Sequence, residues 1–214
     1  MLALTQRGAG RGAGGFTLLE LMVVLVIFGV LLAVGVPRMT SWTLATKAGA
    51  ATELYAEGFK LARQQALSHN AASRIVLTPN LLNGQYDWQV DICFPQPGLP
   101  CSNSTGVWST ISAPAGADPE GAAGYVSVFR SAAALPQSEV LLPALLPEGA
   151  SSIYFTALGW VDTTFPQRLT QIRFDPTPAY AANLRASAVT VNLAGTAAKC
   201  DPLVAVTDSR ACPP

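Results

Sequence analysis

Residues 15–20 read Gly15-Phe16-Thr17-Leu18-Leu19-Glu20, and an apolar run follows them without a break to residue 36. Of the 21 residues from 16 to 36, only four lack an apolar side chain: Thr17, Glu20, Gly29 and Gly35. A helix rises 1.5 Å per residue, so this run spans roughly 30 Å, the thickness of a bilayer's hydrocarbon core. The stretch therefore predicts a membrane-spanning helix.

Glu20 is the one charged side chain in this run. A carboxylate at mid-membrane costs about 2.5–3.5 kcal/mol, whereas each Leu, Ile, Val or Phe returns about 0.3–0.6 kcal/mol. The run holds 15 such residues, so insertion remains favourable. Intramembrane carboxylates are usually functional because they pair with a cation. Glu20 is either tolerated near the interface or used in such a pair.

A short leader with Arg7 and Arg11 ends at Gly15, directly ahead of this helix. The arrangement resembles the type IV prepilin signature shared by pilins and by the pseudopilins of type II secretion. The resemblance implies that a membrane prepilin peptidase cuts between Gly15 and Phe16 and methylates the new N-terminus at Phe16. It also implies that Glu20 pairs with the N-terminal amine of a neighbouring subunit in the filament.

The leader lacks the apolar core of an ordinary signal peptide, so the run behind it is expected to stay in the mature chain. Its basic residues favour a cytoplasmic N-terminus. With the resemblance, this predicts a single-pass protein of the inner membrane with a periplasmic globular domain. Removal of the leader leaves 11 basic and 13 acidic residues, a net charge of −2. No basic stripe is evident, so DNA is not an expected partner.

Pro37 lies just beyond the span. Proline removes one helical donor and clashes with the carbonyl four residues earlier, so a kink or a local melt is expected between residues 33 and 37. In pilin filaments this part of the helix is often stretched, and an ordinary proline kink is the alternative.

Residues 41–70 predict an amphipathic helix. Apolar side chains recur at steps of three and four, which places them on one face: Leu44, Ala48, Ala51, Tyr55, Phe59, Ala62 and Ala66. The helix should end at His69 and Asn70, because asparagine tolerates the left-handed conformation of a C-terminal cap.

Beyond Asn70 the apolar period changes to two. The clearest alternation covers residues 86–94, and residues 73–78, 125–130, 152–156, 171–174 and 187–193 read similarly. No long helical segment separates these strands, so the sheet should be mostly antiparallel. The predicted fold is α+β and pilin-like. Its parts are a leader (1–15), a transmembrane or filament-core helix (16–40), an amphipathic helix (41–70) and a β-rich domain (71–214).

Two further segments narrow the resemblance. Residues 62–70, ARQQALSHN, resemble an element of the FimT/FimU/GspH group of minor pilins and pseudopilins. Residues 189–195 resemble the terminal strand of that group, where an arginine-containing turn often follows the glycine. Here Thr196 and Ala198 stand in place of those arginines. The lone His69 could act as a pH switch, but a favourable charge near the helix C-terminus is the simpler reading.

Four cysteines fall into two local pairs, Cys93 with Cys101 and Cys200 with Cys212. A zinc site would need closer spacing or added histidines, and the chain has a single histidine. Four cysteines allow three connectivities, of which the two local disulfides are favoured. Disulfides indicate an oxidising compartment, the periplasm or the cell exterior.

Asp87 and Asp91 lie on one strand face and could be read as paired catalytic carboxylates. A solvated strand face is the better reading, because no histidine, thiolate or metal cluster supports acid–base chemistry. The sequence also lacks hydrolase, phosphate-loop and zinc-protease motifs. We therefore expect no enzyme activity, no cofactor and no metal.

These observations predict a minor type IV pilin that primes or joins pilus assembly near the tip. Its partners would be the prepilin peptidase, other minor pilins and the major pilin. An H-type pseudopilin of type II secretion has the same architecture and is the first alternative. A DNA-binding minor pilin for natural transformation is another.

Overall fold

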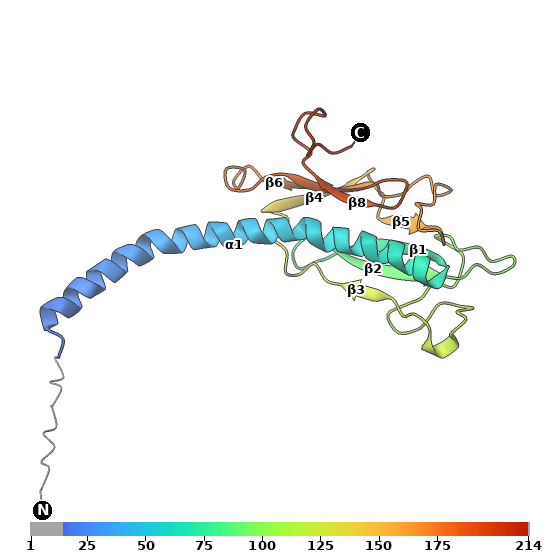
Figure 1. The fold of residues 1–214 in the computed structure, drawn as a ribbon, viewed down its shortest axis with the longest axis horizontal. Helices are drawn as coiled ribbons and strands as arrows, with labels where there is room; N and C mark the ends of the chain where they lie inside the picture. The colour runs from blue at the N-terminus through green and yellow to red at the C-terminus, as the bar shows by residue number, and fades with distance from the viewer. Residues whose placement is uncertain (1–14, 214) are drawn as a thin grey trace, which may run out of the picture. The chain divides into compact units, whose positions relative to one another are not determined.

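The computed structural model describes residues 15–213, so the leader arginines Arg7 and Arg11 lie outside the described residues. The chain divides into two compact units, Met1–Trp42 and Thr43–Pro214. One helix, α1 (Leu18–His69), supplies the described helical residues of the first unit and the first element of the second (Figure 1).

In the first unit, α1 is uninterrupted around Pro37. Of the two expectations, a kink or a local melt, the local melt is therefore wrong. A proline removes only one backbone hydrogen bond, which a long helix can lose without ending. The large apolar side chains of this part of α1 are half or more exposed, as at Leu31 (64%) and Val36 (52%).

In the second unit, eight strands form two four-stranded sheets with the orders β3-β2-β1-β5 and β4-β6-β7-β8. The strands are β1 (Ala72–Pro79), β2 (Tyr86–Cys93), β3 (Val128–Arg130), β4 (Leu141–Leu146), β5 (Ser152–Phe155), β6 (Gln171–Pro176), β7 (Ser187–Val191) and β8 (Ala197–Cys200). A short 3₁₀ helix, η1 (Gly121–Ala123), lies in the loop before β3. Every pairing between these strands is antiparallel, which confirms the predicted α+β fold.

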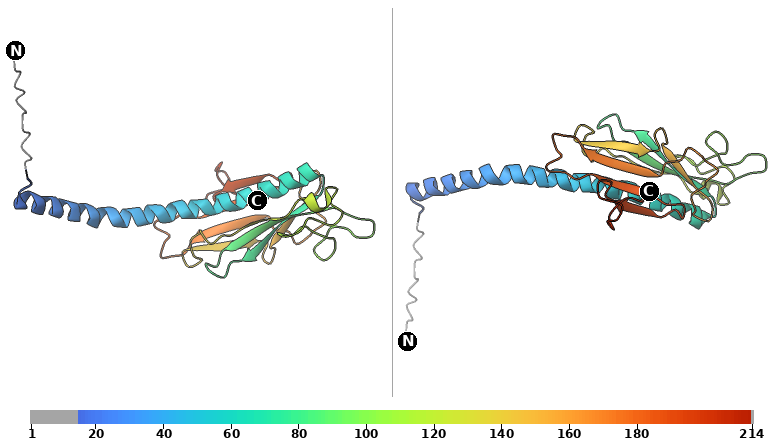
Figure 2. Two further views of the ribbon diagram at one scale, coloured as in Figure 1. Left: turned by 90° about the horizontal axis from the view of Figure 1, so that it is seen from below. Right: turned by 90° about the horizontal axis from the view of Figure 1, so that it is seen from above.

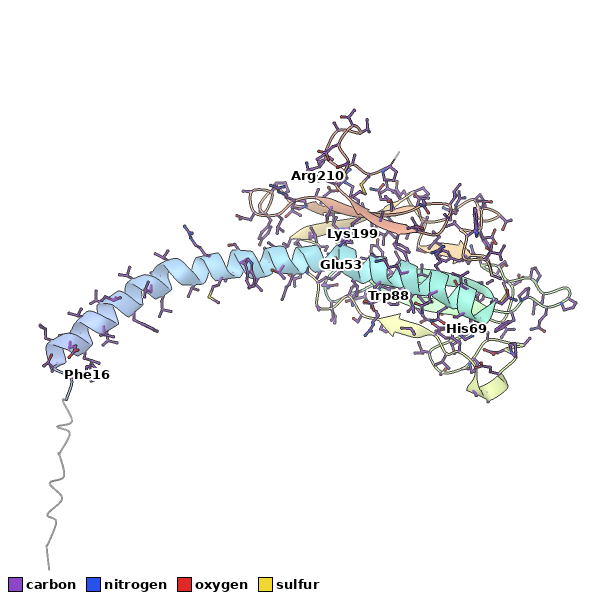
Figure 3. All side chains as sticks on the ribbon, in the orientation of Figure 1. Phe16, Glu53, His69, Trp88, Lys199 and Arg210 are labelled. Atoms are coloured by element: carbon purple, nitrogen blue, oxygen red, sulfur yellow. A yellow bond between two sulfur atoms is a disulfide. The ribbon has the colours of Figure 1, made fainter. Side chains whose placement is uncertain are left out.

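Residues 43–69 of α1 lie along both sheets (Figures 1 and 2). The predicted face is buried from Ala48 to Ala66, and Leu44 is half-buried. A small residue at Gly58 allows this close approach, since a Cβ there would lie 2.6 Å from Ile75 Cδ1. Trp88 of β2 points to the helix and its Nε1 donates to the Leu54 carbonyl at 3.0 Å (Figure 3).

The helix ends where the sequence predicts. Asn70 has φ 48°, the left-handed conformation, and the Ala71 amide donates to the Ala66 carbonyl at 3.2 Å. This six-to-one bond is the mark of a Schellman cap. The chain therefore reverses at Asn70 and enters β1.

The strand predictions are confirmed in outline. Alternation places Trp88, Val90 and Ile92 of β2 in the core. The third predicted strand is shorter than expected, since it begins only at Val128. The strands also divide between two sheets. Near β5, the edge strand of the first sheet, the Leu169 amide, just before β6 of the second sheet, donates to the Ser152 carbonyl at 2.8 Å.

Candidate functional site

The expected processing site lies at the start of α1. Gly15 and Phe16 precede the helix, and Phe16 is 82% exposed (Figure 3). Thr17 caps the helix, because its Oγ1 accepts a hydrogen bond from the Glu20 amide at 3.2 Å. The bond that the peptidase is expected to cut is thus open to a protein partner.

The capping role of Thr17 is not among the sequence-based predictions, although the sequence contains a signal for it. Thr17 and Glu20 have the spacing of a capping box, a threonine followed three residues later by a glutamate. Glu20 itself is exposed at the first turn of α1. A carboxylate in the first turn also interacts favourably with the helix dipole.

Beyond Glu20, α1 carries apolar side chains on all sides. An 18-residue window of the helix has a mean hydropathy of 2.8, and none of it is buried. Within residues 15–213 it is the one helix long and apolar enough to cross a membrane. A helix that is apolar all round requires a membrane or other protein around it.

The expectation of a solvated strand face is wrong for Asp91, which is buried. Its Oδ2 pairs with Arg74 Nε at 2.8 Å, and its Oδ1 accepts from Gln89 Nε2 at 2.7 Å. The Arg74 guanidinium in turn stacks on the Trp108 ring at 4.2 Å. A loop that starts beyond Cys93 brings Trp108 over this face of the sheet, which period-two patterning alone could not reveal.

Asp87 serves a different network. Its Oδ1 accepts from Asn80 Nδ2 and from the Ala132 amide, each at 2.7 Å. The two carboxylates thus have separate sets of partners, Asp91 within the strands and Asp87 in the loops, and do not form a catalytic pair. Across residues 15–213, no cluster of three or more His, Cys, Asp and Glu side chains could hold a metal ion.

Two families match the chain. The Prokaryotic N-terminal methylation motif matches residues 10–36, and Type II transport protein GspH matches residues 50–195. The second match covers more than half of the chain.

The chain belongs to the GspH family.

Searches of curated proteins and of solved structures found no match. The two family matches together make this chain a pilin-like subunit of the minor pilin or pseudopilin type, as the FimT/FimU/GspH resemblance predicts. Subunits of this kind build assemblies and are not enzymes. An apolar N-terminal helix suits such a subunit to single-helix membrane anchoring.

The GspH match ends at Gly195, so β8 and the tail lie outside it. In the structure Cys200 is bonded to Cys212, and Cys93 to Cys101. The Cys93–Cys101 bridge closes a loop beside β2, and the second bridge closes a C-terminal loop. These are the two local pairings that the spacing favours.

His69 lies at the C-terminal end of α1, half-buried, with its ring centre 5.3 Å from that of Tyr125 (Figure 3). Burial raises the pKa of the Tyr125 hydroxyl to about 12, so this ring stays neutral at physiological pH. The contact gives His69 a packing role at the helix end that the sequence did not suggest.

Proposed function

We propose that this GspH-family chain is a minor type IV pilin, anchored in the inner membrane with its β domain in the periplasm. The prepilin peptidase cuts between Gly15 and Phe16 and methylates Phe16. The subunit then joins other minor pilins and the major pilin near the filament tip.

One observation carries the proposal: an exposed glutamate follows an exposed N-terminal segment on a helix that is apolar all round. In the bilayer or in a bundle of such helices, an unpaired Glu20 carboxylate is costly. The Phe16 amine of an adjacent subunit would supply the opposite charge. Pairing of these two groups would align neighbouring helices in the filament.

The H-type pseudopilin is a second candidate, and the match to Type II transport protein GspH favours it. The disulfide-closed C-terminal loop beyond that match favours the pilus group. Deletion of the gene separates the two functions. Loss of pili with normal enzyme secretion would support the minor pilin, whereas the reverse result would assign the chain to type II secretion.

Glu20→Ala tests the assembly step directly. We expect this variant to insert and to be processed, yet to enter filaments poorly. Glu148→Ala is the matched control, because it removes an exposed carboxylate from the β domain. Normal incorporation of Glu20→Ala, measured by immunoblot of sheared filaments, would show that the carboxylate is tolerated rather than used.

A further inference from the structure

Four large apolar side chains are exposed where three segments of the second unit meet. Leu67 lies near the end of α1, Leu158 and Trp160 in the turn after β5, and Leu193 in the turn before β8. Their exposed fractions are 49%, 71%, 59% and 58%. We refer to these four residues as the Trp160 patch.

The three segments are joined by hydrogen bonds and by close backbone packing. Arg63 Nε of α1 donates to the Gly159 carbonyl at 3.1 Å, and the Val161 amide donates to the Leu193 carbonyl at 3.0 Å. A Cβ on Gly159 would lie 3.0 Å from Leu67 Cγ, so α1 packs directly on the turn. Gly195 packs on the Gly159 carbonyl in the same way, where a Cβ would lie at 2.3 Å. The patch is thus presented by one fixed arrangement of backbone.

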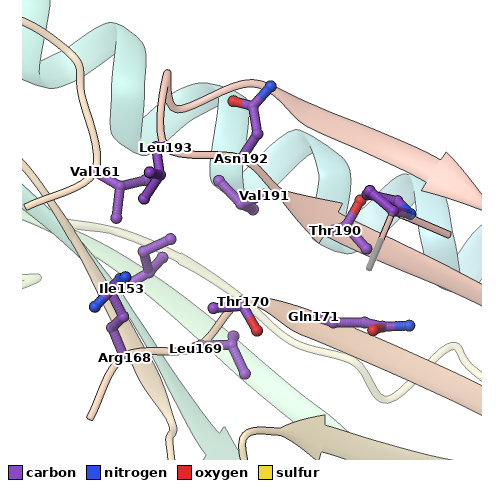
Figure 4. Close-up of a pocket in the computed structure, with 11 residues that line it drawn as sticks. Ile153, Val161, Arg168, Leu169, Thr170, Gln171, Thr190, Val191, Asn192 and Leu193 are labelled. Atoms are coloured by element: carbon purple, nitrogen blue, oxygen red, sulfur yellow. The ribbon is translucent and has the colours of Figure 1, made fainter. Parts of the chain in front are cut away.

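A hollow borders the patch on the side of the two sheets (Figure 4). It has a volume of about 390 Å³, and its apolar lining includes Ile153, Val161 and Leu193. Arg168 is the one charged side chain that lines it. Its Nε is buried without a hydrogen-bond partner within residues 15–213, and its Nη1 donates to the Phe165 carbonyl at 3.2 Å. A carboxylate that entered this hollow would therefore meet the positive charge of Arg168.

A second hollow of about 390 Å³ borders the patch on the side of α1. It is lined by Lys60, Arg63 and Leu67 of the helix and by residues 195–197. Among the described residues that line the two hollows, none is an aspartate or a glutamate. The apolar patch is thus flanked by cations on both sides.

Three acidic side chains lie close to this surface in the chain or in space: Asp162, two residues beyond Trp160, and Glu53 and Glu57, which line a further hollow with Lys60. Asp162 Oδ1 accepts from the Thr164 amide at 2.9 Å and from the Thr164 hydroxyl at 2.6 Å. Glu57 pairs with Arg130 at 3.8 Å. Lys60 therefore has acidic neighbours on its own helix. Arg63 and Arg168 donate to backbone carbonyls, which do not neutralise a positive charge, so these two guanidinium groups are available to a molecule that covers the patch.

We propose that the Trp160 patch is a docking site for a protein partner that presents large apolar side chains flanked by carboxylates. Exposed apolar patches rimmed by polar groups mark interaction surfaces, and tryptophan and arginine are the residues most often found at their energetic centres. Opposite charge on the partner would steer it to the two cationic hollows. This goes beyond filament assembly through the apolar part of α1, because it assigns a contact to the second unit.

The test uses the full chain in detergent micelles and two labelled twelve-residue peptides. One alternates Leu or Phe with Asp, and the other carries Lys in place of each Asp. Fluorescence anisotropy should show a Kd for the acidic peptide at least about tenfold lower than for the basic one, and the difference should shrink as salt is added. Trp160→Ala should raise the Kd of the acidic peptide about tenfold or more.

Two variants sharpen the result. Arg168→Gln should weaken the binding of the acidic peptide and make its Kd less dependent on salt. Leu203→Ala is the matched control, because Leu203 is 69% exposed in the C-terminal loop, outside the patch. It should leave the Kd unchanged.

Several results would overturn the docking site: equal binding of both peptides, no binding of either, or equal losses in Trp160→Ala and Leu203→Ala. Concentration-dependent dimers that Trp160→Ala abolishes would show that a second copy covers the patch instead. None of these outcomes depends on Glu20, so they leave the filament proposal intact.

Discussion

Lys199 of β8 forms an ion pair with Glu53 of α1, across 146 positions of sequence (Figure 3). The hydrogen bond and the positive charge of Lys199 lower the pKa of the Glu53 carboxyl. Arg210 also has an acidic partner, since its Nη2 donates to Asp208 Oδ2 at 2.8 Å. This hydrogen bond lowers the pKa of the Asp208 carboxyl to about 2. Lys199 and Arg210 are the only cations after Arg185, and each has an acidic partner.

We therefore predict weak binding to DNA. Affinity for a duplex comes largely from Lys and Arg that neutralise phosphates, and cations already paired with carboxylates contribute less. For the full chain in micelles at about 0.15 M salt, Kd should be no tighter than the non-specific range of roughly 10⁻⁴–10⁻⁶ M. Submicromolar binding that fell in a Lys199→Ala, Arg210→Ala variant would favour the DNA-uptake function instead.

Removal of Arg74 from its buried ion pair with Asp91 should cause a large loss of stability. Arg74→Met would retain the apolar stem beside Trp108 but leave Asp91, whose side chain is 2% exposed, without its cation. Loss of one partner of a buried pair costs about 3–5 kcal/mol. We expect a loss of that size in urea unfolding followed by tryptophan fluorescence.

Arg173→Met provides the control for this measurement. Arg173 and Asp175 form a pair of the same length, 2.8 Å, but their side chains are 35% and 33% exposed. Pairs open to solvent contribute up to about 1 kcal/mol. Equal losses in the two variants would mean that burial of Asp91 does not decide the cost.

Much of this fold can be predicted from the spacing of apolar residues along the sequence. The buried stripe of α1, its end at Asn70 and the alternation of β2 are local patterns, and local patterns are visible in one sequence. By contrast, β4 contains Pro143 and β8 consists largely of alanine and lysine, so neither resembles a strand. Both are edge strands that depend on a neighbour for their pairing.

The candidate sites also divide into those that can be read from local sequence and those that form only on folding. Residues 15–20 are contiguous, so the processing motif can be read directly from the sequence. Asp91 and the Trp160 patch depend on segments that meet only in the folded chain. Arg74 lies 17 positions from Asp91, and Arg63 lies 96 positions from Gly159. No periodicity encodes such contacts.

Tyr55 predicts a loss of stability at alkaline pH. It is fully buried, its hydroxyl donates to the Tyr86 carbonyl at 2.6 Å, and it accepts from the Tyr86 amide at 3.1 Å. Burial raises its pKa above the ordinary tyrosine value of about 10. The folded chain therefore keeps this proton at a pH where the unfolded chain has released it. The stabilisation is complete below pH 10 and is lost as the pH rises toward the folded-state pKa.

Tyr55→Phe should lower the free energy of unfolding by about 1–3 kcal/mol at pH 8, because both backbone groups of Tyr86 lose their partner. The gap between variant and parent should narrow at about pH 11, where the parent loses the contribution of Tyr55. Urea titrations at the two pH values measure it, with Tyr180→Phe, at a half-buried tyrosine, as the control. If the difference in free energy of unfolding were the same at both pH values, the raised pKa of Tyr55 would be contradicted.

Processing is expected to depend on the small size of Gly15. A Cβ on Gly15 would meet no atom within 4 Å, and the residue precedes the first turn of α1, so Gly15→Leu should leave the fold unchanged. The peptidase is expected to accept only a small side chain beside the bond it cuts. Gly15→Leu should therefore accumulate as full-length precursor in the inner membrane. Gly29→Leu is the matched control, since a Cβ at Gly29 also meets no atom within 4 Å and the site lies within α1, away from the cut. Mass spectrometry should find Phe16 as a methylated N-terminus in the parent and in Gly29→Leu only, and a mature N-terminus at any other residue would contradict the predicted cut.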